Sequence, residues 1–155
     1  MRKTYSVIAW IIAGGVVVQA AAIAFAFGGL LHHVSEGGVV DKALVETRQA
    51  PFVGELGFIL HGLVGAGLIP LLAIALLVIS FFVHTRGARF WAAITFGLVV
   101  VQVTLGFAII ALPYVGLIHG ANALAIVVAA SVAALRVRQA QRTVAKEPAA
   151  DGIRV

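Results

Sequence analysis

The chain has 155 residues, of which 62% are hydrophobic and 11% are charged, with a net charge of +5 and no cysteine. This composition excludes an ordinary soluble domain, which needs far more polar surface. The absence of cysteine excludes disulfides, thiolate-bound metals and haem attached through thioethers. The basic residues lie at the ends of apolar stretches without a nucleic-acid-binding motif, so we expect no nucleic-acid partner.

Four long stretches without charge follow one another along the chain. A helix needs roughly 20 apolar residues to cross the hydrocarbon core of a bilayer, and all four stretches are long enough. The first is also far longer than the ~7–15 apolar residues of a signal-peptide core, so we expect a permanent helix there. Strand-period alternation is absent. The pattern predicts helices at about 7–31, 56–83, 90–112 and 114–135.

The fold class that follows is all-α, an integral membrane four-helix bundle formed by residues 1–138. An outer loop spans residues 32–55 and holds four acidic residues against two basic ones. Residues 139–155 are polar enough that we expect a flexible cytoplasmic tail.

The lysines and arginines are distributed unevenly around the four predicted helices. Nine flank the ends on the side of the two termini, and only Lys42 and Arg48 lie on the other side. The positive-inside rule therefore places both termini in the cytoplasm. We expect a multi-pass protein of a bacterial inner (plasma) membrane, with the lipid bilayer as its first partner.

The sequence contains an internal repeat. Shifting the chain by 83 positions places Gln19 on Gln102 within the repeated letters VVVQ, and shifting it by 58 places His61 on His119 within the repeated letters HG. Both copies begin on the same side of the membrane, so they read as parallel helical hairpins related by an axis along the membrane normal.

His61 and His119 are the candidate metal ligands. Each lies five residues into its predicted helix, about 8 Å below the outer helix end, so the repeat places the two at equal depth. Opposed histidines with small neighbouring residues suit a b-type haem with two axial imidazoles. Two alternatives stay open: a polar contact between helices without any cofactor, and a different ligand.

Further residues are candidates for contacts with the cofactor. Gln19 and Gln102 lie about 15–18 Å from the outer ends, some 8 Å deeper than the histidines, so we expect a hydrogen bond between helices or a contact to a haem edge or quinone. His32, His33 and Arg48 could hold a haem propionate from the outer side.

Asn122 lies one turn after His119 and could bond a polar group within the bundle.

The stretch VVVQVTLGFAIIALPYVGLIHGANALAI, residues 99–126, resembles the third and fourth helices of a four-helix half of haem A synthase. The stretch at 54–77 is similar to that family's second helix, with a glutamate ahead of the histidine. The resemblance implies that His61 and His119 are the axial pair and Glu55 the acidic residue. The chain departs from the family in having one four-helix half, a longer gap from Glu55 to His61 and no cysteine pair. It is also similar to small four-helix membrane proteins of high-GC bacteria.

Three functions remain as expectations. The first is a membrane protein that binds haem b and serves electron transfer or haem handling in a respiratory membrane, with no catalytic activity of its own. The second is a cofactor-free accessory subunit of a respiratory or other membrane complex. The third is an oxygenase of the haem A synthase type that works as a homodimer to restore eight helices.

Overall fold

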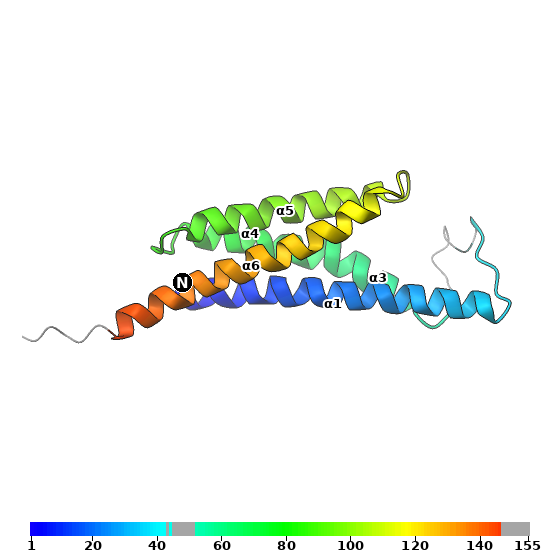
Figure 1. Ribbon diagram of the computed structural model, residues 1–155, viewed down its shortest axis with the longest axis horizontal. Coiled ribbons are helices and arrows are strands. Elements are labelled where there is room, and N and C mark those ends of the chain that lie inside the picture. The colour runs from blue at the N-terminus through cyan, green and yellow to red at the C-terminus, as the bar shows by residue number, and fades with distance from the viewer. Residues whose placement is uncertain (43, 45–51, 147–155) are drawn as a thin grey trace, which may run out of the picture.

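The computed structural model describes residues 1–42, 44 and 52–146. Over these residues it is helical without strands, and its elements are α1 (Arg2–Ser35), α3 (Glu55–Leu63), η1 (Val64–Leu68), α4 (Ile69–Ser80), α5 (Ala88–Ala108) and α6 (Val115–Lys146). Because α3, η1 and α4 form one continuous rod, the described chain makes four rods (Figure 1). All four are long and apolar enough to cross a membrane, as the sequence predicts.

The helix bounds differ in places from the predicted ones. α1 begins at Arg2 and continues to Ser35, whereas α5 ends at Ala108, before the predicted 112. α6 continues to Lys146, into the segment predicted as a tail, because alanine, arginine, glutamine and lysine are strong helix formers that continue the last turn. Residues 147–155 lie outside the described part.

The four rods pack in a ring. α1 contacts α6 on one side and the α3–η1–α4 rod on the other, and α5 contacts both α6 and α4. The α3–η1–α4 rod and α6 are therefore diagonal neighbours, and so are α1 and α5. This arrangement places the two predicted histidine-bearing helices opposite each other across the centre.

The buried positions of α1 recur in α5 at the spacing of the sequence repeat. The inward faces of α1 and α5 coincide when the chain is shifted by the same 83 positions that superpose the two glutamines. The buried pairs are Tyr5 and Ala88, Ala9 and Ala92, Ile12 and Thr95, and Val16 and Val99. The two helices that start the hairpins thus present equivalent faces to the core.

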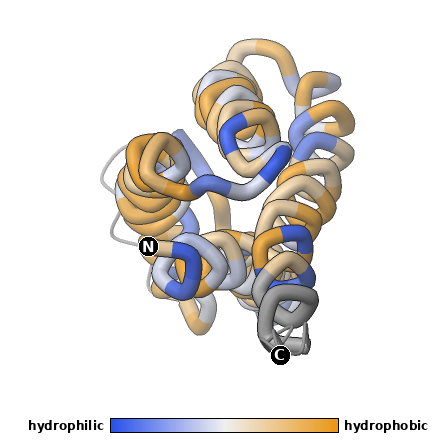
Figure 2. The backbone as a smooth tube through the Cα atoms, turned by 90° about the vertical axis from the view of Figure 1, so that its left-hand side faces the viewer, coloured by the Kyte–Doolittle hydropathy of each residue, from blue (hydrophilic) through white to orange (hydrophobic). Residues whose placement is uncertain are grey.

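The apolar core is concentrated toward one end of the bundle. We call this end of the bundle the basic end, because Arg2, Arg86, Arg89 and Arg136 lie there. We call the opposite end, where α1 ends and α3 begins, the loop end. Figure 2 shows hydrophilic residues gathered at the basic end, which faces the viewer, with apolar helices behind. The largest buried side chains lie in this half and include Tyr5, Ile12, Leu76, Ile126 and Val137.

Packing is looser toward the loop end. α3 packs against α1 there, but among the described residues its backbone stays apart from the backbones of α5 and α6. The large side chains of Leu63, Phe107 and Leu117 are at least 70% exposed. The two hairpins therefore separate in the half of the bundle where His61 and His119 lie.

Glycines allow α3 to approach α1 closely at the loop end. A methyl group added to Gly57 would collide with the carbonyl oxygen of Ala22 and come within 3.0 Å of Ala26. Gly54, which precedes α3, has φ of 122°, in a region that side chains rarely adopt. Small residues of this kind are typical of tight helix packing in membranes, where helices gain no hydrophobic energy by leaving lipid.

A π-helical turn, η1, joins α3 to α4. Pro70 lies just after it, in the first turn of α4. Proline has no N–H, so Pro70 cannot bond the carbonyl of Ala66 as an unbroken α-helix would require. Wide turns of this kind occur frequently at functional sites. η1 begins three residues after His61.

Candidate functional site

His61 is fixed to α1 through its ring. Its Nδ1 atom lies 3.1 Å from the backbone carbonyl oxygen of Gln19. A carbonyl oxygen only accepts hydrogen bonds, so Nδ1 carries the proton and donates. In the neutral imidazole the lone pair then lies on Nε2, and this tautomer can bind a metal through that atom.

His119 makes the equivalent contact in the second hairpin. Its Nδ1 atom lies 3.1 Å from the backbone carbonyl oxygen of Gln102 on α5. The same tautomer follows, with Nε2 as the acceptor. The two contacts are related by the sequence shifts of 58 and 83, so each hairpin orients its histidine with the main chain of its own glutamine.

The two imidazole rings meet across the bundle. Their centroids are 6.2 Å apart, and the ring planes are tilted by 56°. Both side chains are half-buried. Among the described residues no group of three or more His, Cys, Asp or Glu side chains gathers that could hold a bare metal ion. The polar centre of the described bundle is therefore built on a pair of histidines.

A chain of amides ends on His119. Asn122 donates from Nδ2 to the Leu98 carbonyl oxygen at 2.9 Å and to Gln102 Oε1 at 2.7 Å. With its oxygen held in this way, Gln102 donates from Nε2 to His119 Nε2 at 3.0 Å. The Gln102 amide thus bonds the atom through which His119 would bind a metal.

The corresponding amide in the first hairpin is oriented differently. Gln19 donates from Nε2 to the Leu60 carbonyl oxygen at 3.3 Å and does not contact the His61 ring through its side chain. Its Oε1 atom is buried without a hydrogen-bond partner in the described residues. The shift of 58 places Val64 on Asn122, and Gly65 lies against Gln19 Oε1; neither residue has a side-chain amide to donate. The two hairpins therefore share the histidine anchor and differ in the amide beside it.

This difference predicts unequal effects of two matched substitutions. Gln102→Leu removes the two side-chain bonds to His119 and Asn122, and we expect it to lower the free energy of unfolding by about 1–4 kcal/mol, at 0.6–2 kcal/mol for each bond between membrane helices. Gln19→Leu removes one long hydrogen bond and a buried oxygen that already lacks a partner, so we expect almost no change in the free energy of unfolding. Reversible unfolding in mixed micelles measures both. A larger loss for Gln19→Leu than for Gln102→Leu would contradict this interpretation.

The glutamines do not lie about 8 Å deeper than the histidines, and that prediction is wrong. The ring of each histidine contacts the main chain of its glutamine directly. Two features explain the error. α5 ends early, at Ala108, and α1 extends past the start of α3, since Gly29 rather than the end of α1 lies against Val53 and Gly54. Counting from the predicted helix ends therefore overstated the depth of both glutamines.

The remaining candidates lie apart from the pair. His32 and His33 are in the last turn of α1, and the His33 ring packs against Phe52 at 5.8 Å. His33 is fourteen positions beyond Gln19, or about 21 Å along the helix axis, because each residue adds 1.5 Å. The structure does not bring these two histidines to the site. Arg48 lies outside the described residues.

Sequence reasoning missed two residues of the site. Gly106 on α5 lies against His119, and a methyl group there would come within 3.3 Å of Cε1. Leu98 supplies the carbonyl that holds Asn122. The spacing from Leu98 to Gln102 to Gly106, four residues each, is the signal that these residues share one face of α5.

The fold and the site together define a helical bundle with four membrane-length helices and a central histidine pair anchored on main-chain carbonyls. Comparisons with protein families, curated proteins and solved structures find no match for this chain. Its function is therefore argued from the geometry of the site.

Proposed function

We propose that the chain is a multi-pass membrane protein that holds one b-type haem between His61 and His119. The observation that carries this proposal is the 6.2 Å separation of the two ring centroids across the bundle. Two imidazoles that bind one metal from opposite sides, with bonds of about 2 Å, have their centroids roughly 6 Å apart. The separation of the rings is compatible with this arrangement, which would require the Gln102 amide to leave Nε2 of His119.

The hydrogen bonds of the histidines support the same function. Metal-binding histidines donate their second ring N–H to a carbonyl or carboxylate, which fixes the ring and its tautomer. His61 and His119 both do so, to the carbonyl oxygens of Gln19 and Gln102.

Glycines lie next to both histidines, and those at positions 62 and 120 are exposed. Methyl groups added to Gly62, Gly116 and Gly120 would meet nothing within 4 Å. The separation of α3 from α5 and α6 lies in the same half of the bundle. Apolar residues line both hairpins there, which suits a porphyrin better than a hydrated ion.

Electron transfer, or the handling of haem for a respiratory complex, is the activity that such a site favours. His61 and His119 would hold the haem, and the bound group would supply one-electron chemistry at this site. The role of this chain is then to hold the two rings, set their tautomer and exclude water. We infer no catalytic activity of its own.

The orientation follows from charge. Arg2, Arg86, Arg89 and Arg136 at the basic end place that end in the cytoplasm under the positive-inside rule. The histidine pair then lies nearer the outer leaflet of a bacterial inner membrane, where an electron partner on the outer side could approach it.

The test is the visible spectrum of the purified full chain after expression with ample haem. We expect one haem per chain and a sharp low-spin b-type signal in the reduced-minus-oxidised difference spectrum. A protein that stays colourless after haemin titration would remove the proposal.

A second function is a cofactor-free subunit of a larger membrane complex. The observation that favours it is the closed amide chain, in which Asn122 holds Gln102 and Gln102 bonds His119 Nε2. In this case the histidines are structural contacts between helices. Co-purification of the chain with a defined complex, in the absence of haem, would support it.

A further inference from the structure

The basic end of the bundle concentrates positive charge without a nearby carboxylate. Arg2 begins α1, Arg86 and Arg89 flank the start of α5, and Arg136 lies on α6. The carboxylates among the described residues are Glu36, Asp41 and Glu55, and all three belong to the loop end. No described side chain therefore neutralises these arginines.

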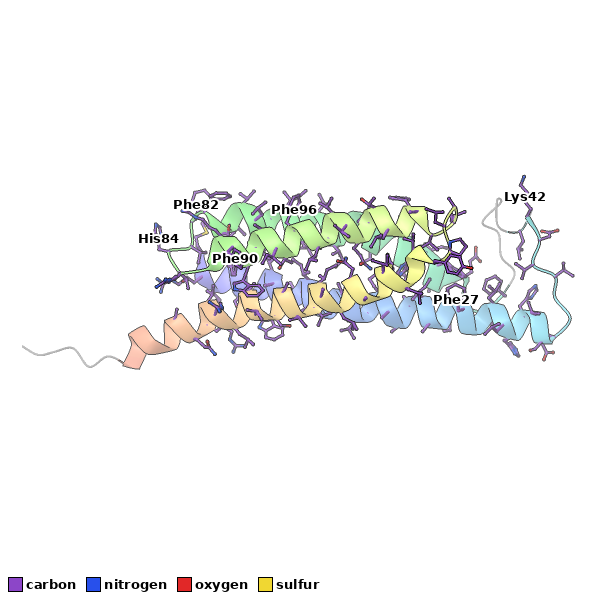
Figure 3. All side chains as sticks on the ribbon, turned by 45° about the horizontal axis from the view of Figure 1, so that its top comes forward. Phe27, Lys42, Phe82, His84, Phe90 and Phe96 are labelled. Atoms are coloured by element: carbon purple, nitrogen blue, oxygen red, sulfur yellow. The ribbon has the colours of Figure 1, made fainter. Side chains whose placement is uncertain are left out.

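A shallow hollow of about 480 Å³, largely open to the surroundings, lies in the connection between α4 and α5. Its lining includes His84, Thr85, Arg86, Arg89 and Phe90. Figure 3 shows His84 and Phe90 together at this end, with Phe82 beside them and Lys42 at the opposite end. The hollow thus combines cationic, polar and aromatic side chains.

The arginines around the hollow are held in place by neutral groups. Arg89 donates to the Phe81 carbonyl oxygen at 3.2 Å and lies over the Phe81 ring at 5.3 Å. Arg2 donates to the His84 carbonyl oxygen at 3.5 Å. These contacts orient the guanidinium groups and leave their charge uncompensated.

Two more positive groups border the same hollow. The guanidinium of Arg136 lies beside Gly87, within 3.5 Å of where a methyl group would stand, and over the Trp91 ring at 5.7 Å. Arg86 makes no hydrogen bond or ion pair with the described residues, although it lines the hollow. It is thus available to an anion.

Neutral hydrogen-bond donors complete the lining. The Thr85 hydroxyl oxygen is buried and has no hydrogen-bond partner in the described part of the chain. α5 begins directly beside it, with no acidic residue in its first turn and no side-chain cap. The Ala88 N–H bonds the Thr85 carbonyl oxygen at 3.0 Å, and the positive end of the helix dipole favours a negative charge beside this turn.

The flanks of the hollow are apolar. Phe81, Phe82 and Phe90 are all more than half exposed. Arginines suit a phosphate group, and exposed aromatic side chains suit hydrocarbon chains. A phospholipid presents both groups side by side at the membrane surface. A soluble phosphate would gain nothing from the three phenylalanines.

We propose that this basic hollow binds the phosphate group of an anionic phospholipid in the leaflet that faces the basic end. Arg86 and Arg89 contact the phosphate oxygens, the Thr85 hydroxyl donates to one of them, and the acyl chains lie along Phe82 and Phe90. The site is separate from the histidine pair, and the proposal does not rest on haem binding.

The test is the binding of short-chain phosphatidylglycerol to the purified full chain in a neutral detergent, measured by native mass spectrometry and by the rise in unfolding temperature. We expect Arg86→Gln to weaken binding about fivefold, because it removes a charge-assisted hydrogen bond to the phosphate. Thr85→Val should also weaken it, although removal of an unpartnered buried hydroxyl leaves the unliganded fold equally or more stable. Phosphatidylcholine serves as the zwitterionic comparison.

Arg138→Gln is the matched control, because it removes one charge from the exposed surface of the same end, outside the hollow. Its binding should stay within about twofold of the wild-type value. An equal loss in Arg138→Gln and Arg86→Gln would overturn the proposal in favour of diffuse surface charge. Stabilisation by inorganic phosphate, at matched ionic strength, as strong as that by phosphatidylglycerol would overturn the assignment to a lipid.

Discussion

Replacing either His61 or His119 with alanine should abolish the low-spin b-type spectrum that we expect of the wild-type chain. If the two rings hold the haem as proposed, the loss of either ring would remove one of the two side chains that bind the iron and would change the spectrum. Loss of an outer-shell partner typically weakens metal binding 10- to 100-fold. Loss of an axial ligand should exceed that, and the double variant should bind no haem. Haemin titration followed by absorbance measures haem binding in the two single variants and in the double variant.

His84→Ala is the control for these variants. His84 is exposed at the basic end, far from the pair, so its replacement should leave the spectrum and the affinity unchanged. An equal loss in His84→Ala would show that haem binds non-specifically to exposed imidazoles. A retained low-spin signal in His61→Ala or His119→Ala would show that the axial pair is a different one.

Gly57→Leu should strongly destabilise the packing of α3 against α1. A side chain at this position collides with the Ala22 carbonyl and the Ala26 backbone, so α3 must move away from α1. Overpacking of this kind typically costs about 1–3 kcal/mol of unfolding free energy, and the main-chain collision here puts the expected loss near 3 kcal/mol. Reversible unfolding in mixed micelles measures this loss.

The same change should also reach the candidate site. Gly57 and His61 are four residues apart and lie on one face of α3. Displacement of α3 therefore separates the His61 ring from the Gln19 carbonyl. We expect the affinity for haem and the free energy of unfolding to fall together. Gly28→Leu is the matched control, since a methyl group there meets nothing within 4 Å. A stable Gly57→Leu variant would mean that α3 packs elsewhere.

The sequence allowed the four helices and the meeting of the two histidines to be predicted, because both depend on patterns along one chain. Apolar length determines which segments can span a bilayer. The shifts of 58 and 83 relate His61 to His119 and Gln19 to Gln102, and two hairpins with equivalent faces bring the histidines together.

The hydrogen bonds around the pair could not be predicted in the same way. They depend on where helices end and how far one slides past another, and neither quantity follows from composition. The contact of His61 with the Gln19 carbonyl requires α1 to extend beyond the start of α3. The different roles of Gln19 and Gln102 depend on a single side chain, Asn122, whose counterpart is Val64.

The π-helical turn between α3 and α4 explains how the α3–η1–α4 rod can match α6 both at the histidine and at the buried core, as far as Val137. Before η1 the matching shift is 58, from His61 to His119; after η1 the buried residues match at a shift of 57. The matched buried pairs are Ile69 and Ile126, Ala73 and Ala130, Leu76 and Ala133, and Ser80 and Val137. The first hairpin therefore contains one additional residue. An insertion in an α-helix rotates everything beyond it by about 100°. Here η1 absorbs the extra residue in a single wide turn, so the histidine and the core both keep their register.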